Sequence, residues 1–514
     1  MSFGGDFCRW LAVIALAVGD ALGAAAPIRR EAVRTLPPED PARREWRLAE
    51  VARRRLGPAV IVHRGATAFA PENTLHACAY AMDYGADGVE TDLRRAADGT
   101  LVLFHDETVE RLLMGFGRVR DYDLPGLLAL EPVRWRGRPQ GGAVATFADL
   151  LHLVRERAML LHLDLKEPGL EAEVAGQLAD ADVWAHVVSI NEAHAATLRQ
   201  DPRFEPLRYK APGLQADRLD VDPAAVRAAL AADGDMILVD DPRVATHVLA
   251  RPAHAPERFT IEYRLVLPLP DVQAGAATTG VPAMVRRLQG AYGPLRGDAF
   301  LPLLAGGMGD PNQVESAPPT AAMIRRAWAA MECGRQTVDT RAIRRALERI
   351  VARPTFAEDP SLHALDALIA ARALGQLGAT GSADNLIEAW LRYDGRSGPD
   401  TPPADLWRRW RERMTILPAL GEMPCRTARR FLWRYVVLPP EVAARFGPLE
   451  YADATRSLLA QVLMWDEIAE LVRSPIPAVR GTAILECLDH PTEDRRRALQ
   501  AGAPWALQLP SARP

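Results

Sequence analysis

Residues 59–106 read AVIVHRGATAFAPENTLHACAYAMDYGADGVETDLRRAADGTLVLFHD, and this stretch decides the fold. It contains three short apolar runs. The first and last runs end at His63 and His105, and the run between them ends in Glu90 and Asp92. Residues at helical spacing fill the interval between the first two runs. This alternation favours parallel β/α architecture, in which polar residues at the ends of strands gather at one edge of the sheet.

The alternation continues beyond this stretch. We predict strands at Ala59–Val62, Gly88–Asp92, Leu101–Phe104, Met159–Leu165, Val187–Ile190, Leu207–Lys210 and Met236–Val239. We predict helices at Thr74–Tyr84, Phe147–Glu156, Leu170–Ala179, Glu192–Gln200 and Pro223–Ala232. Periodicity leaves a doubly wound sheet and a (β/α)8 barrel both open. Chemistry that is spread over the ends of several strands is typical of the barrel.

Three carboxylates are candidate ligands of a metal ion. Glu90 and Asp92 stand two residues apart on one strand, so their side chains share a face. Asp164 repeats this position on a later strand, with Lys166 two residues further on. Three carboxylates suit a hard cation, magnesium or calcium, better than zinc. The alternative for any single carboxylate is that it forms an ion pair with Arg64 or Lys166 and binds no metal.

Two histidines stand beside the carboxylates. His63 and His105 each terminate an apolar run, and imidazole is the side chain suited to general acid–base chemistry near neutral pH. A single histidine at the end of a strand is more often structural. Two histidines that flank a carboxylate cluster indicate catalysis.

Several separate motifs resemble one family in their order and spacing. They are His63-Arg64-Gly65, Pro71-Glu72-Asn73-Thr74, Gly85-Ala86-Asp87-Gly88-Val89-Glu90-Thr91-Asp92, Asp98-Gly99 and His105-Asp106. Together they resemble the glycerophosphodiester phosphodiesterase family, from about Ala59 to His247. The resemblance implies a (β/α)8 TIM barrel that hydrolyses glycerophosphodiesters to glycerol 3-phosphate and an alcohol, with Mg²⁺ or Ca²⁺ as cofactor.

The resemblance also implies roles for individual residues. By motif position, His63 and His105 match the acid–base pair, Glu90 and Asp92 match metal ligands, and Arg64 matches the phosphate-contacting arginine. Lys166 follows the position of a third ligand and would also bind phosphate. That ligand is usually glutamate in the family and is Asp164 here, one methylene shorter. The stretch Leu214 to Asp222 lacks the aromatic residue that the family has there.

The composition and the N-terminus limit the function further. The chain has 514 residues and a net charge of -4, which gives no reason to expect a nucleic-acid partner. Arg9 precedes an apolar run at 11–19, and small residues follow it. This layout predicts a signal peptide over 1–25 and a secreted or periplasmic protein, with a packed N-terminal helix as the alternative.

The second half of the chain has a different character. After a lead-in at 26–57 and a barrel at 58–250, we predict a linker or docking segment over 251–320 and a helical accessory domain over 321–514. Helical spacing recurs at Thr340–Val351, Ser361–Leu377, Ser382–Leu391, Ala404–Met414 and Tyr451–Val472. Two segments, Ala370 to Gly378 and Val479 to Leu488, weakly resemble helices of HEAT-type repeats. Trp407 to Arg413 is either a solvated helix face or a peripheral contact with anionic lipid.

Two other functions remain open at this point. One is a catalytically weakened barrel that serves as a helical-repeat interaction protein, whose protein partner the sequence does not identify. The other is a phosphodiesterase that acts on larger phospholipid headgroups and releases a cyclic phosphate. The presence of both histidines, two carboxylate ligands, Arg64 and Lys166 favours glycerophosphodiester hydrolysis.

Overall fold

The computed structural model describes most of the chain. The described residues are 31–32, 38–135, 138–191, 194, 197–198, 200, 202, 221–231, 236–251, 264–265, 280–293, 295–305, 319–355, 359, 362–394, 415–437 and 448–511. The predicted signal peptide, the strand at Leu207–Lys210 and the helix at Ala404–Met414 lie outside these residues and stay predictions. Within the described part, no helix is both long enough and apolar enough to span a membrane.

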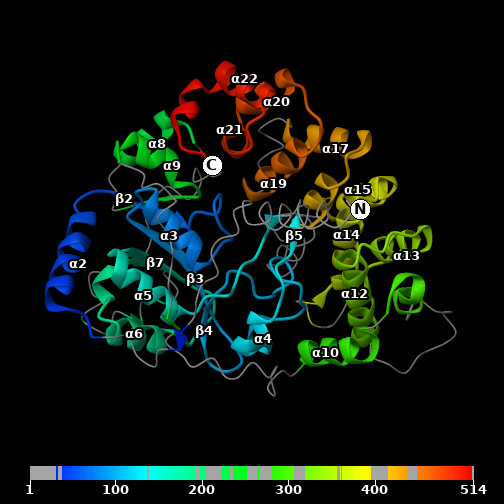
Figure 1. The fold of residues 1–514 in the computed structure, drawn as a ribbon, viewed down its shortest axis with the longest axis horizontal. Coiled ribbons are helices and arrows are strands. Elements are labelled where there is room, and N and C mark those ends of the chain that lie inside the picture. The colour runs from blue at the N-terminus through cyan, green and yellow to red at the C-terminus, as the bar shows by residue number, and fades with distance from the viewer. Residues whose placement is uncertain are drawn as a thin grey trace, which may run out of the picture.

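A curved parallel sheet forms the centre of the N-terminal half (Figure 1). Its strand order is β8-β7-β3-β2-β9, and all four neighbouring pairs are parallel. The bounds are β2 (Ala59–His63), β3 (Gly88–Arg95), β7 (Leu160–Leu165), β8 (Val187–Ile190) and β9 (Met236–Val239). This arrangement is the parallel half-barrel expected of a TIM barrel, and the predicted fold class is confirmed.

The two faces of the sheet carry different residues. Val60, Val62 and Val89 are buried under the connecting helices. The opposite face begins with a small apolar cluster that includes Ile61 and Leu238. Because side chains alternate along a strand, the polar residues toward the carboxyl ends of the strands lie on this same face. The apolar cluster therefore fills the interior at the amino ends of the strands, and the polar residues lie at the carboxyl ends.

Helices connect the strands and cover the sheet. They are α3 (Leu75–Asp83), α5 (Phe147–Arg157), α6 (Glu171–Asp180), α8 (Pro223–Ala231) and α9 (Pro242–Val248), with α2 (Pro41–Arg54) at the side. Thr74 caps α3 by accepting a hydrogen bond from the Ala77 N–H. Thr146 and Asp149 form a reciprocal capping box at the start of α5. These local signals explain why the predicted and observed helix starts agree.

One predicted strand has a different partner from the one expected. The run at Leu101–Phe104 forms β4 (Leu101–Leu103), which pairs antiparallel with β3 rather than joining the parallel sheet. The connection between β3 and β4 is the short turn around Gly99, whose φ of 86° favours glycine. Such a tight turn can join only antiparallel strands, because a parallel pair needs a long crossover. His105 therefore reaches the site from a hairpin.

An insertion follows β4. It contains η1 (Val119–Asp121), α4 (Leu124–Leu128), β5 (Arg134–Trp135) and β6 (Arg138–Pro139). A separate apolar cluster that includes Phe104, Leu113 and Tyr122 fills its interior. The insertion is thus a folded subdomain on one side of the sheet.

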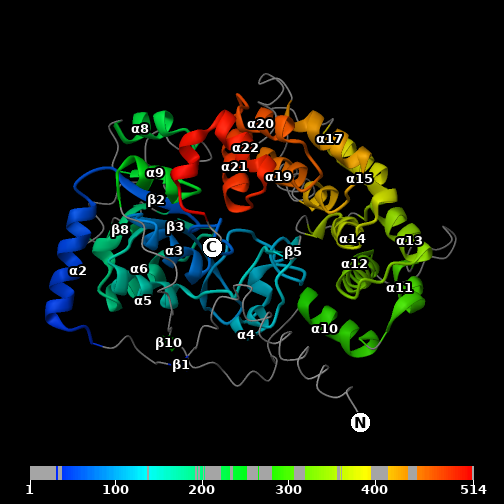
Figure 2. The ribbon, with the colours of Figure 1, turned by 45° about the horizontal axis from the view of Figure 1, so that its top comes forward.

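The second half of the described chain is all-α and curves around the insertion and one side of the sheet (Figure 2). Its helices are α10 (Gly280–Tyr292), α11 (Leu301–Ala305), α12 (Pro319–Arg335), α13 (Arg341–Ala352), α14 (Leu365–Gln376), α15 (Ala383–Asp394), α17 (Arg426–Val436), α19 (Pro448–Leu459), α20 (Trp465–Val472), α21 (Pro477–Asp489) and α22 (Glu493–Gly502). Many of them pack on the helix next but one, as α12 does on α14 and α19 does on α21.

Two predicted segments in this half have more helical structure or more breaks than expected. The segment 251–320, predicted as a linker or docking segment, contains α10 and α11 among its described residues. The segment Tyr451–Val472 is two helices, α19 and α20, rather than one. A new helix begins there because the Glu467 carboxylate accepts a hydrogen bond from the Met464 N–H. The helical spacing continues across the break, which is why periodicity did not reveal it.

A buried ion pair and a buried hydrogen bond join the helical half to the sheet and its insertion. Arg243 on α9 is 1% exposed and donates to Asp241 and, from Nη1 at 2.6 Å, to Asp489 on α21. Arg372 on α14 donates from Nη1 to the Glu110 carbonyl oxygen at 2.7 Å. The helical half therefore packs on the N-terminal half through specific polar contacts.

Candidate active site

Two neighbouring parallel strands bring three carboxylates together. Glu90 and Asp92 lie on the interior face of β3, and Asp164 lies opposite Asp92 in the register of β7. One ligand oxygen from each of the three lies within 4.8 Å of the others. The shorter side chain of Asp164 therefore still reaches the cluster. The ligand set predicted from the sequence is brought together in space.

Two cations face these carboxylates. Lys166 Nζ lies 2.5 Å from Asp164 Oδ2 and 2.9 Å from Asp92 Oδ1. Arg64 Nε lies 3.3 Å from Asp92 Oδ2. Burial would raise the pKa of Asp92, but Arg64 and the neighbouring cations lower that pKa far below its ordinary value. Asp92 is therefore charged across the whole physiological range.

Glu90 behaves in the opposite way. It is 3% exposed, and burial together with the charges of Asp92 and Asp164 raises the pKa of Glu90 well above its ordinary value. Three carboxylates so close together repel one another, and two cations compensate only part of their charge. A donor set of oxygens with excess negative charge fits a hard divalent cation.

Each predicted catalytic histidine is held by a carboxylate. His63 Nδ1 lies 2.8 Å from Asp240 Oδ1, and His105 Nδ1 lies 2.7 Å from Asp106 Oδ1. A carboxylate at Nδ1 favours the tautomer that carries its proton there and makes Nε2 the atom for proton transfer. His63 Nε2 lies 4.0 Å from Glu90 Oε2, which places this nitrogen beside the carboxylate cluster.

The loop after β2 supports the cluster through an unusual backbone. Arg64 and Asn73 adopt positive φ angles of 58° and 53°, which are uncommon for residues other than glycine, although asparagine adopts them more readily than arginine. Between them, Gly65 has a φ of 79°, and a Cβ there would lie 2.6 Å from the Ala77 carbonyl carbon. This geometry directs the Asn73 amide onto Asp92 Oδ2 at 2.7 Å. Asn73 therefore orients a candidate ligand, and the cap of the following helix is Thr74.

A second set of charges links this loop to His105. Arg111 donates to both Glu72 and Asp106 at 2.6 Å, and Glu72 also accepts from Arg64 Nη1 at 3.1 Å. Burial would raise the pKa of Glu72, but Arg111 and Arg64 lower it to about 2. The carboxylate that holds His105 is thus fixed by the same arginine that fixes the loop carrying Arg64.

Four supporting residues were not predicted as parts of the site: Asn73, Asp106, Arg111 and Asp240. A signal existed for Asp240, because it continues the interior face of β9 after Met236 and Leu238. No comparable spacing marks Arg111, which lies in the insertion. His162 lies opposite Glu90 in the register of β7 and is 9% exposed, and burial lowers its pKa to about 4. It is therefore a neutral residue of the interior.

The fold and the site define a domain of TIM-barrel type with a carboxylate and histidine cluster at the carboxyl ends of its strands. Residues 63–200 match the model of the Glycerophosphoryl diester phosphodiesterase family. The resemblance stated from the motifs is therefore confirmed over these residues.

Individual relatives agree with this placement. A glycerophosphodiester phosphodiesterase of Caldanaerobacter subterraneus subsp. tengcongensis is 31% identical over 153 residues, which are 29% of this chain and 63% of the relative. Glycerophosphodiester phosphodiesterase 1 of Bos taurus is 44% identical over 86 residues, 17% of this chain and 26% of the relative. The chain thus spans less than two thirds of the length of these curated relatives.

Solved structures are also similar. A glycerophosphodiester phosphodiesterase from Agrobacterium tumefaciens aligns over 37% of this chain and 100% of its own, with 24% identity and a TM-score of 0.31. An Oleispira antarctica phosphodiesterase, solved in complex with the product sn-glycerol-3-phosphate, aligns over 38% of this chain and 97% of its own, with 22% identity and a TM-score of 0.30.

Proposed function

We propose that this chain hydrolyses glycerophosphodiesters to glycerol 3-phosphate and an alcohol. The observation that carries the proposal is the convergence of Glu90, Asp92 and Asp164 between two histidines that are each held by a carboxylate. Acid–base chemistry on a phosphodiester needs one group to accept a proton and another to donate one. The family match over residues 63–200 supports the same reaction.

Each group of site residues has a separate role in the proposed hydrolysis. Glu90, Asp92 and Asp164 would hold a magnesium or calcium ion, which supplies a Lewis acid for a phosphoryl oxygen. Arg64 and Lys166 neutralise charge on the phosphate. One histidine takes a proton from the attacking hydroxyl or water, and the other protonates the leaving alkoxide. Asp240 and Asp106 stabilise the imidazolium that each step requires.

Release of glycerol 3-phosphate tests the proposal. The protein should release it from glycerophosphocholine, glycerophosphoethanolamine or glycerophosphoinositol when Mg²⁺ or Ca²⁺ is present. EDTA should abolish the release, and titration with either ion should restore it. Full activity in EDTA would refute the metal site. Phosphorus NMR distinguishes the reaction from cyclisation, and accumulation of a cyclic phosphate as the end product would contradict hydrolysis.

Metal affinity should depend on pH in a defined direction. Because the pKa of Glu90 is raised, this carboxyl keeps its proton to a higher pH than an ordinary glutamate, and a cation must displace that proton to bind. The affinity for Mg²⁺ or Ca²⁺ should therefore rise with pH and level off once Glu90 is ionised. Calorimetric titration of the metal-free protein across pH measures this. Glu90→Gln removes the titrating group, so a slope that is equally steep in this variant would contradict the assignment.

A further inference from the structure

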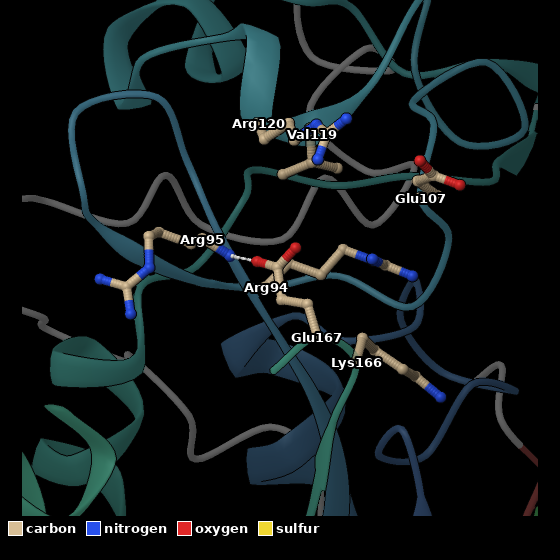
Figure 3. A pocket seen from close by; sticks show the side chains of 7 residues that line it. All are labelled: Arg94, Arg95, Glu107, Val119, Arg120, Lys166 and Glu167. Carbon is tan, nitrogen blue, oxygen red and sulfur yellow. Dashed lines mark hydrogen bonds between the residues drawn. The ribbon is translucent and has the colours of Figure 1, made fainter. Parts of the chain in front are cut away.

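A pocket continues from the candidate active site beyond Lys166. It has a volume of about 240 Å³, and Figure 3 shows the side chains that line it. Lys166 belongs to both places, because its Nζ contacts Asp92 and Asp164 and its side chain lines the pocket. Arg94 lines the pocket and donates from Nη2 to the His105 carbonyl oxygen at 2.9 Å. A ligand group in this pocket would therefore lie next to the reacting phosphodiester.

The pocket lining is rich in positive charge. It contains four cations, Arg94, Arg95, Arg120 and Lys166, and two carboxylates. One of these carboxylates, Glu107, pairs with Arg118 at 2.8 Å, and Arg118 is not part of the lining. The other, Glu167, accepts the backbone N–H of Arg95. Counted over the lining alone, four cations and two carboxylates leave a net positive charge.

One of the cations is available for a ligand. Arg120 on η1 is exposed, and among the described residues it forms no hydrogen bond or ion pair. By contrast, Arg95 Nη1 is engaged by Glu173 at 2.5 Å, and Arg94 by His105. These contacts hold Arg94 and Arg95 in place, whereas Arg120 can turn its planar guanidinium onto an anion.

The chemistry of a glycerophosphodiester decides which part of the substrate could enter. The glycerol phosphate portion is constant and carries only the phosphate that reacts. A second anion can therefore lie only on the alcohol portion, which is the part that varies between substrates.

We propose that this pocket binds a second anionic group, a phosphate or a carboxylate, on the alcohol portion of the diester. The inference rests on the proposed hydrolysis and adds to it a preference for doubly anionic substrates. Arg120 is the residue that distinguishes them from neutral ones.

Two matched pairs of substrates test the preference in the full chain with Mg²⁺ or Ca²⁺ present. Glycerophosphoinositol 4-phosphate is compared with glycerophosphoinositol, and glycerophosphoglycerate with glycerophosphoglycerol. The first pair adds a phosphate and the second a carboxylate. In each pair, kcat/KM should be roughly tenfold higher for the anionic member, the effect of one additional charge-assisted contact. The ratio should fall as salt rises, because the pocket is open to solvent.

The variant Arg120→Gln should bring the ratio close to one, mainly through KM. Arg345→Gln is the control, because it makes the same substitution at an exposed arginine on α13. Equal kcat/KM within both wild-type pairs, or a ratio that Arg120→Gln leaves unchanged, would overturn the anion pocket while the hydrolysis proposal stands. Absence of glycerol 3-phosphate from all four diesters would overturn both. A preference in only one pair would identify which anion the pocket accepts.

Discussion

Replacing His105 with alanine should lower kcat for release of glycerol 3-phosphate by roughly 10²–10⁴-fold, the usual contribution of a positioned acid or base. His63→Ala should have an effect of the same size. The physical reason is that Asp106 or Asp240 fixes each imidazole through Nδ1 and leaves Nε2 for proton transfer, and alanine removes that atom. Both variants should remain folded, because neither histidine belongs to the apolar clusters.

Three measurements make this prediction specific. Circular dichroism and the urea midpoint confirm that each variant folds. His247→Ala is the control, because His247 is an exposed histidine on α9. The pH profile of kcat/KM in the active protein should have an acidic and a basic limb, and Asp240→Asn should shift one limb, because that carboxylate stabilises the charged form of His63. Turnover like that of the wild type in either alanine variant would refute acid–base catalysis by the pair.

The residues that bear the chemistry could be predicted because each lies at the end of a short apolar run. Glu90, Asp92 and Asp164 share strand faces, and alternation along a strand is a local property of the sequence. The supporting residues were harder to predict. Asp240 is 177 residues from His63, and Arg111 reaches Glu72 across 39 residues. Such contacts depend on the pairing of β2 with β9 and on the fold of the insertion, which no local pattern encodes.

In the helical half, too, the local elements could be predicted from the sequence but their long-range contacts could not. Its helices were predicted from their spacing, and α13, α14 and α15 agree with the predicted segments to within a few residues. Their packing partner was not predicted. Arg118 in the insertion pairs with Asp359 at 2.7 Å, and Arg138 lies 3.4 Å from Glu486 on α21. Part of the surface that an interaction protein would offer to a partner therefore contacts its own insertion.

Asp489→Ala should destabilise the protein by roughly 3–5 kcal/mol, the usual cost of leaving one member of a buried ion pair without its partner. Asp489 accepts from both terminal nitrogens of Arg243, at 2.6 and 3.0 Å, and the Arg243 side chain is fully buried. Removing this carboxylate leaves the guanidinium with Asp241 and the Pro510 carbonyl oxygen as its hydrogen-bond acceptors among the described residues. Urea unfolding measures the loss. Glu470→Ala, at an exposed position on α20, is the control, and an equal effect of both changes would contradict the prediction.

Asp489→Ala should also lower the activity of the candidate active site. Asp241, the other partner of Arg243, directly follows Asp240, which holds His63. Asp489 in the helical half therefore helps to fix the end of β9 through Arg243 and Asp241. Without Asp489, the position of Asp240 and its hydrogen bond to His63 should be less well fixed. Asp489→Ala should lower kcat several-fold with little change in KM, because positioning of the histidine affects the transition state more than ground-state binding. Unchanged kcat in a clearly destabilised variant would show that the helical half stabilises the fold without positioning the catalytic pair.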